Sequence, residues 1–190
     1  MKKISDIVKP FSEIIFGALF FLCYFNYLAF KGEALGIGIA ATVISAYYLA
    51  IGIVNFVAGD KLPEGLKKVT DIVSISAFPL FIFVSKLLTT IDAHELLGPA
   101  GWTLIILGMV GSLGLAVVYA VARIVNKPVL TKIAYIFASV FVLVLLADIL
   151  FTIDGFPTDL GNVVIVDLVI DVLYVSMLFA SFPKEEKVSE

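Results

Sequence analysis

Three aspartates stand inside long apolar runs near the C-terminal end of the sequence, where a carboxylate is expensive to place. They are Asp148, Asp167 and Asp171. A charge at the centre of a bilayer costs about 2.5–3.5 kcal/mol on insertion scales. Charged residues there therefore form ion pairs, contact a partner protein or line an ion path. Asp167 and Asp171 are four residues apart and therefore share one face of a helix.

Lys86 is the cation that we expect at a depth comparable to that of these carboxylates. A hairpin folded near residues 156–157 would bring Asp148 within one helical turn of Asp167, in the outer half of a membrane. We therefore expect Lys86 to be the counter-ion of Asp148 or Asp167. Asp171 would lie near the midplane as the deepest ionisable residue.

The carboxylates can be interpreted in three ways. They can line a path for protons or cations, with Asp148, Asp167, Asp171 and Lys86 as its residues. They can instead bond to neighbouring helices and hold the bundle together. They can also face a cationic partner protein.

Pro79 predicts a hinge in the helix that contains it. A proline has no N–H, so the carbonyl of Ile75 loses its helical hydrogen bond, and Ser74 and Ser76 are placed to restore hydrogen bonding there.

Glu13 and Asp71 stand near the starts of their apolar runs. We interpret both as carboxylates favoured by the dipole of a first helical turn, with no further role.

The elements that position these residues are expected to be membrane-spanning helices. Hydrophobic residues make up 61% of the 190 residues, and the mean hydropathy is +1.11. Soluble domains contain only about 45–50% apolar residues. Runs of about 20 residues cross a hydrocarbon core of about 30 Å as helices. The sequence predicts an all-α fold with one integral membrane domain over residues 1–190, six spans, short loops and a frayed charged tail at 183–190. The spans are expected at about 11–30, 34–58, 66–90, 101–125, 129–153 and 160–182.

The basic residues predict the orientation of these spans. Only Lys31 and Lys86 fall on one side of the expected topology. The other eleven fall on the opposite side: Lys2, Lys3, Lys9, Lys61, Lys67, Lys68, Arg123, Lys127, Lys132, Lys184 and Lys187. Because basic residues gather in the cytoplasm, both termini are expected there, in the cytoplasmic membrane of a cell.

Small residues recur along the second and fourth runs. We expect them to let helices pack closely within the chain, with an oligomer interface as the alternative. They are Gly38, Ala41, Ser45, Gly52 and Gly59 in the second run, and Gly101, Gly108, Gly111, Ser112 and Gly114 in the fourth.

Several functional classes are disfavoured by the residues present. Cys23 is the only cysteine and His94 the only histidine, so neither a metal site of the usual kind nor a cofactor is expected. No basic cluster indicates nucleic acid.

The sequence favours a non-catalytic transporter or channel-like protein that is proton- or cation-linked. The alternative is an accessory or scaffold subunit that binds another membrane protein. Its expected surroundings are the lipid bilayer and either further copies of the chain or a partner membrane protein.

Overall fold

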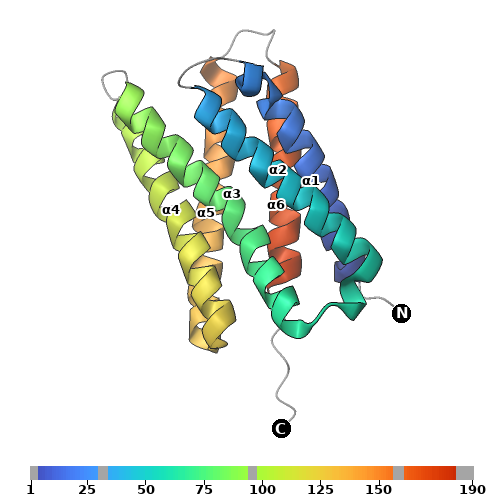
Figure 1. The fold of residues 1–190 in the computed structure, drawn as a ribbon. Helices are drawn as coiled ribbons and strands as arrows, with labels where there is room; N and C mark the ends of the chain where they lie inside the picture. Colours follow the sequence, from blue (N-terminus) through green and yellow to red (C-terminus); the bar gives the residue numbers. More distant parts are fainter. Residues whose placement is uncertain (1–3, 30–33, 94–97, 156–160, 183–190) are drawn as a thin grey trace.

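The structure is a computed structural model in which residues 4–29, 34–93, 98–155 and 161–182 are described. Side chains are described over residues 7–25, 35–59, 61–88, 90–91, 98–147 and 168–182. These parts of the chain are helical, without a β-strand, so the all-α prediction is confirmed (Figure 1). The elements are α1 (Ile4–Ala29), α2 (Ala34–Ala58), the short 3₁₀ helix η1 (Gly59–Lys61), α3 (Glu64–Ala93), α4 (Pro99–Val125), α5 (Pro128–Gly155) and α6 (Gly161–Ser181).

The helix bounds agree with the expected spans within a few residues, except at the start of α1. This helix begins at Ile4, so Pro10 lies inside it and not in its first turn. The residues that precede the expected span belong to the helix, and Lys9 among them has a partner inside the bundle, the carboxylate of Asp71. Glu13 is therefore well past the first turn of α1, and Asp71 is past the first turn of α3.

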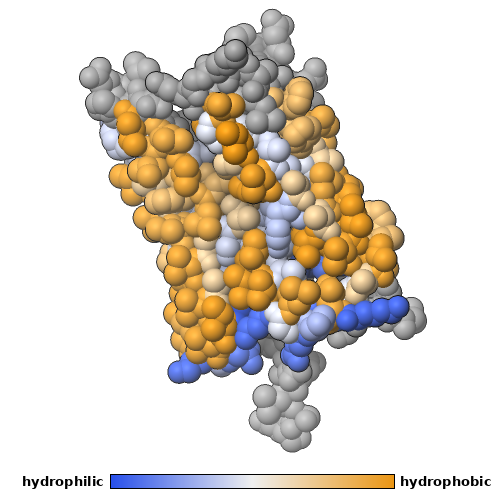
Figure 2. All heavy atoms as spheres, in the orientation of Figure 1, coloured by the Kyte–Doolittle hydropathy of each residue, from blue (hydrophilic) through white to orange (hydrophobic). Residues whose placement is uncertain are grey.

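Five of the helices are long and apolar enough to cross a membrane. They are α1 to α5, whose apolar stretches contain between 19 and 27 residues. The sixth, α6, has 21 residues, of which the shorter stretch Leu168–Ser181 is apolar among the described side chains. Figure 2 shows the consequence: apolar side chains cover the flanks of the molecule, and hydrophilic ones gather at its lower end. The described helices are thus consistent with an integral membrane protein.

The turn from α4 to α5 follows from two residues. Asn126 adopts a left-handed conformation with φ of 56° and donates its backbone N–H to the carbonyl of Ala122 over 2.9 Å, which ends α4. Pro128 then begins α5, where the N–H that proline lacks would have no helical partner. The two helices consequently run antiparallel, side by side (Figure 1).

The helices pack as two groups of three. In the first, α1 packs closely against α2 and α6; in the second, α4 packs closely against α3 and α5. Close backbone approaches between the two groups are far fewer. Figure 1 shows α1, α2 and α6 on the right, α4 and α5 on the left, and α3 crossing in front between them. We call these groups the α1–α2–α6 unit and the α3–α4–α5 unit.

Glycines explain why helices approach so closely within each unit. A Cβ at Gly17 would lie 2.8 Å from the backbone oxygen of Ser45, and one at Gly52 would lie 2.9 Å from the backbone nitrogen of Ile14. In the other unit Gly111 faces the backbone of Phe141. Gly108 and Gly114 make room for side chains of Lys86 and Phe137, respectively. The prediction that small residues serve packing within the chain is confirmed at Gly52, Gly108, Gly111 and Gly114.

Large aromatic side chains fill the space between the two units. Phe16 and Phe20 of α1 face Phe78 and Phe81 of α3, with ring centroids 5.2 Å apart for Phe16–Phe78 and 5.1 Å apart for Phe20–Phe81. Tyr174 of α6 lies 4.9 Å from Phe78. These rings keep the backbones of the two units apart, which is why close approaches are few. The interface between the units is made by side chains.

Candidate functional site

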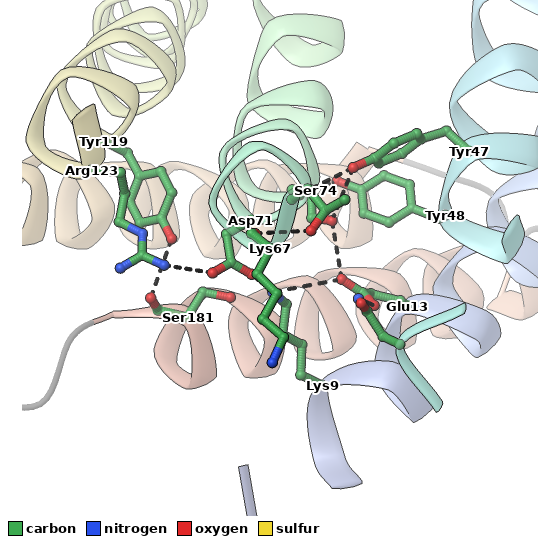
Figure 3. A network of polar contacts seen from close by, with 12 residues as sticks. Lys9, Glu13, Tyr47, Tyr48, Lys67, Asp71, Ser74, Tyr119, Arg123 and Ser181 are labelled. Atoms are coloured by element: carbon green, nitrogen blue, oxygen red, sulfur yellow. Dashed lines mark hydrogen bonds and ion pairs between the residues drawn. The ribbon is translucent and has the colours of Figure 1, made fainter. Parts of the chain in front are cut away.

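Four charged side chains meet where the two units face one another, near the end at which α1 begins. Asp71 of α3 accepts a hydrogen bond from Lys9 of α1, and another from Nη2 of Arg123 of α4 over 2.5 Å. Nζ of Lys9 also lies 3.9 Å from Oε1 of Glu13. The two cations balance the two carboxylates. We call Lys9, Glu13, Asp71 and Arg123 the charge network (Figure 3).

Glu13 is the most enclosed member of this network, with an exposed fraction of 0%. Asn55 of α2 donates to its Oε2 over 2.8 Å, and the hydroxyl of Ser74 of α3 donates to its Oε1 over 3.0 Å. Both bonds come from neutral groups, and the nearest cation, Lys9, has Asp71 as its closer partner. Hydrogen bonds of this kind are what allow a buried carboxylate to persist.

Tyrosines add further bonds between the units. The hydroxyl of Tyr47 donates to the carbonyl of Thr70 over 3.1 Å, and that of Tyr48 donates to the carbonyl of Ser74. From the other side, Tyr119 of α4 donates to the carbonyl of Ser181 at the end of α6 over 3.2 Å. Figure 3 shows Tyr47, Tyr48 and Glu13 converging on Ser74 from one side, with Arg123 and Tyr119 on the other. The contacts of Tyr47 and Tyr48 thus fall on one segment of α3, while that of Tyr119 joins α4 to α6.

Pro79 lies fully buried inside α3, and its effect on hydrogen bonding is visible one turn earlier. The hydroxyl of Tyr174 donates to the carbonyl of Ile75 over 2.5 Å, so α6 satisfies the group that the proline leaves free. The expected donors, Ser74 and Ser76, bond elsewhere: Ser74 to Glu13, and Ser76 to the carbonyl of Ala116. A tyrosine from the last helix replaces the local serines.

The two predicted ion-path residues whose side chains are described, Asp171 and Lys86, do not belong to this network. The side chains of Asp148 and Asp167 fall outside the described residues. Asp171 is half-buried on α6, three residues before Tyr174 and therefore near the same helix face. Lys86 is half-buried on α3, and its aliphatic stem lies over Gly108 of α4.

The position of Lys86 bears on its expected partner. A Cβ placed on Gly108 would touch both the stem of Lys86 and, at 3.3 Å, the side chain of Val144. The side chains of Asp148 and Asp167 lie outside the described residues, so the pairing of Lys86 with either of them stays a prediction.

A mutant cycle tests this pairing. We expect Lys86→Met to destabilise the protein by more than the roughly 0.5 kcal/mol of a surface change, because a carboxylate would be left at bilayer depth without its cation. Adding Asp148→Asn or Asp167→Asn should recover part of that loss. Unfolding in detergent, followed by circular dichroism, measures each free energy, with exposed Lys132→Met as the matched control. Strict additivity for both aspartates would remove the pairing.

The chemistry available to the charge network is the exchange of protons and ion-pair partners. In the part of the chain that the structure describes, no three His, Cys, Asp or Glu side chains gather as ligands for a metal ion. The network offers carboxylates, an ammonium, a guanidinium and hydroxyls in a fixed arrangement between helices. Such groups can hold a proton, release it, or clamp helices together.

Sequence reasoning missed the roles of Glu13 and Asp71, whose interpretation as first-turn carboxylates was wrong. The available signal was the charge at this end of the expected spans: Lys9 stands four residues before Glu13, and Arg123 stands at the same end of another expected span as Asp71.

No family model, no curated protein and no solved structure matches this chain. The class that the helices define, an integral membrane protein, therefore rests on the chain's own composition and structure.

Proposed function

We propose that the protein is a small transporter or channel-like protein of the cell membrane, in which protons or cations move along intramembrane carboxylates between two three-helix units. One observation carries this proposal: Glu13 is completely buried, six residues inside the apolar stretch that begins at Ile7, or about 9 Å along the helix. Ionisable groups at such depth are expensive, and in membrane proteins they mark ion and proton paths.

Polar groups continue from this carboxylate toward the middle of the bundle. Ser74, which donates to Glu13, is adjacent to Ile75, whose carbonyl accepts from Tyr174. Asp171 lies three residues before Tyr174 on α6. In this proposal Asp171 links the charge network to Asp148, Asp167 and Lys86, which serve the outer half of the path.

The arrangement of the helices supports movement of one unit against the other. Within each unit, backbones pack closely over glycines, which favours rigid bodies. Between the units, contact is made by long side chains that can change partners. Transporters commonly work by rocking one bundle against another around a central site. The buried Pro79 is the proposed hinge within α3.

The proposed topology has six spans with both termini in the cytoplasm. We expect single cysteines at residues 64 and 127 to react with a membrane-impermeant thiol reagent only after lysis, and cysteines at residues 94 and 157 to react in intact cells. The native Cys23 must first be replaced. Labelling of residue 64 in intact cells would contradict this topology, and residue 188 provides a second cytoplasmic position.

Transport itself is tested in liposomes with a trapped pH-sensitive dye and an imposed proton gradient. We expect wild type to move protons or cations and Asp171→Asn to abolish the pH dependence, because asparagine keeps the size of the side chain but cannot titrate. The control is Glu64→Gln, an acid-to-amide change at an exposed position of α3. Equal rates in wild type and empty liposomes would refute the proposal.

An accessory subunit without catalytic activity is the second candidate. It is favoured by the balance of the charge network, in which Asp71 has two cations and Glu13 has two hydrogen-bond donors. Such a saturated arrangement also suits a static clamp that holds the bundle in shape for a partner. The liposome experiment separates the two, because a clamp moves no ions.

A further inference from the structure

The charge network contains an imbalance in how its two carboxylates are held. Asp71 contacts both cations directly: Lys9 from one unit and Arg123, at 2.5 Å, from its own. Glu13 accepts only from neutral Asn55 and Ser74, with Lys9 at 3.9 Å. Glu13 is therefore the carboxylate of the network without a direct cation contact, and the one at which we place an arriving proton.

The surroundings of Glu13 determine what its neutralisation would do. The charged and titratable groups around it are Lys9 on its own helix, Tyr47 and Tyr48 on α2, and Asp71 on α3, with Arg123 behind Asp71. Figure 3 also shows Lys67, one turn before Asp71 on α3, beside Lys9 in this view. With Glu13 charged, two cations face two carboxylates. With Glu13 neutral, Lys9 and Arg123 share a single carboxylate, and one positive charge is left uncompensated inside the bundle.

Lys9 is the member of the network whose release would separate the two units. Its side chain is 13% exposed, less than the 26% of Arg123, and it comes from near the beginning of α1. Its bond to Asp71 is an ion pair that joins the two units, whereas Arg123 and Asp71 belong to the same unit. Release of Lys9 would break this bond between α1 and α3.

We propose that Glu13 is a proton-binding site and that its protonation opens the interface between the two units by releasing Lys9 from Asp71. The proton converts the carboxylate of Glu13 into a carboxylic acid, while Lys9 stays an ammonium and moves toward water. Once the interface is open at this end, Glu13 can return its proton to the cytoplasm, and Lys9 pairs with Asp71 again. This inference deepens the proposed function and rests on it for the direction of proton flow.

The accessibility of Lys9 measures opening directly and requires no transport. The full-length protein in lipid nanodiscs is treated briefly with a water-soluble acylating reagent, and mass spectrometry gives the extent of modification of each lysine. Lys132, exposed at the beginning of α5, provides an internal reference, so pH effects common to all amines are divided out. The quantity compared is the ratio of Lys9 to Lys132 modification in mildly alkaline and mildly acidic buffer.

We expect this ratio in wild type to rise about tenfold on acidification, the factor that loss of one hydrogen bond between charged groups contributes to a two-state equilibrium. Glu13→Gln imitates the neutral acid, so its ratio should be high in both buffers. Glu64→Gln, the same chemical change at an exposed site, should behave as wild type. Ser74→Ala removes a donor to Glu13 without changing any charge and should keep the pH response.

Two results of the modification experiment would overturn the proposal. The first is a wild-type ratio that does not change with pH, which is informative even if Glu13→Gln fails to fold. The second is a folded Glu13→Gln variant whose ratio follows that of wild type. If the ratio depends on pH but no ions move in liposomes, the proton site at Glu13 is supported and the transport function is refuted. Proton-driven transport by Glu13→Gln would retain transport and refute the proton site.

Discussion

Asp71→Asn is expected to destabilise the protein by about 3 kcal/mol, because it leaves the charges of Lys9 and Arg123 without the carboxylate that both contact. The expected loss of unfolding free energy is at the low end for broken buried ion pairs, because the side chains involved are between 13% and 26% exposed. Reversible unfolding in mixed micelles, followed by circular dichroism, gives the free energy. Glu64→Gln on the same helix is the control and should stay within about 0.5 kcal/mol of wild type.

A second substitution separates charge balance from lost contacts. Arg123→Gln added to Asp71→Asn leaves Lys9 facing Glu13, so the network is neutral again. The double variant should therefore be more stable than the sum of the two single effects predicts, with a coupling of about 1 kcal/mol or more. Additive effects would mean that the four residues do not act as one network.

Gly17→Ala is expected to cost about 1–3 kcal/mol, although alanine favours helices more than glycine does. The new Cβ would lie 2.8 Å from the backbone oxygen of Ser45 and 2.9 Å from the backbone nitrogen of Leu49. Backbone atoms cannot move aside as a side chain can, so α1 and α2 would have to separate. The measurement is the same unfolding experiment.

Gly36→Ala is the matched control for Gly17→Ala. Gly36 lies in α2, and a Cβ there would meet nothing within 4 Å. We expect its effect to stay within about 0.5 kcal/mol. Equal losses for the two variants would contradict the assignment of Gly17 to a close helix contact.

The helices could be predicted from the sequence because lipid imposes a length and an apolar composition on anything that crosses it. From the same run of apolar residues, however, the start of α1 was predicted too late in the sequence. In the sequence Lys9 resembles an ordinary basic flank, yet in the structure it lies inside α1 and bonds to Asp71, 62 residues away. A hydropathy pattern contains no information about that distant partner.

The candidate site was harder to predict for the same reason. The hydrogen-bond donors to Glu13 are Asn55 and Ser74, which belong to two other helices. Likewise, the carbonyl freed by Pro79 was expected to bond to neighbouring serines, yet its donor is Tyr174, 99 residues from Ile75. Depth in the membrane can be read from one helix at a time, but pairing requires knowing which helices are neighbours.

The packing of α6 against α1 has a consequence for biosynthesis. The ribosome makes α1 first and α6 last, so the face of α1 that α6 covers must remain open throughout the synthesis of the four helices between them. During that time the carbonyl of Ile75 also lacks the hydroxyl of Tyr174. Insertion of α6 covers this face of α1 and supplies the hydrogen bond to the carbonyl of Ile75 at the same time. A chain cut short before its last helix would thus expose an unfinished face to the membrane and to the proteases that survey it.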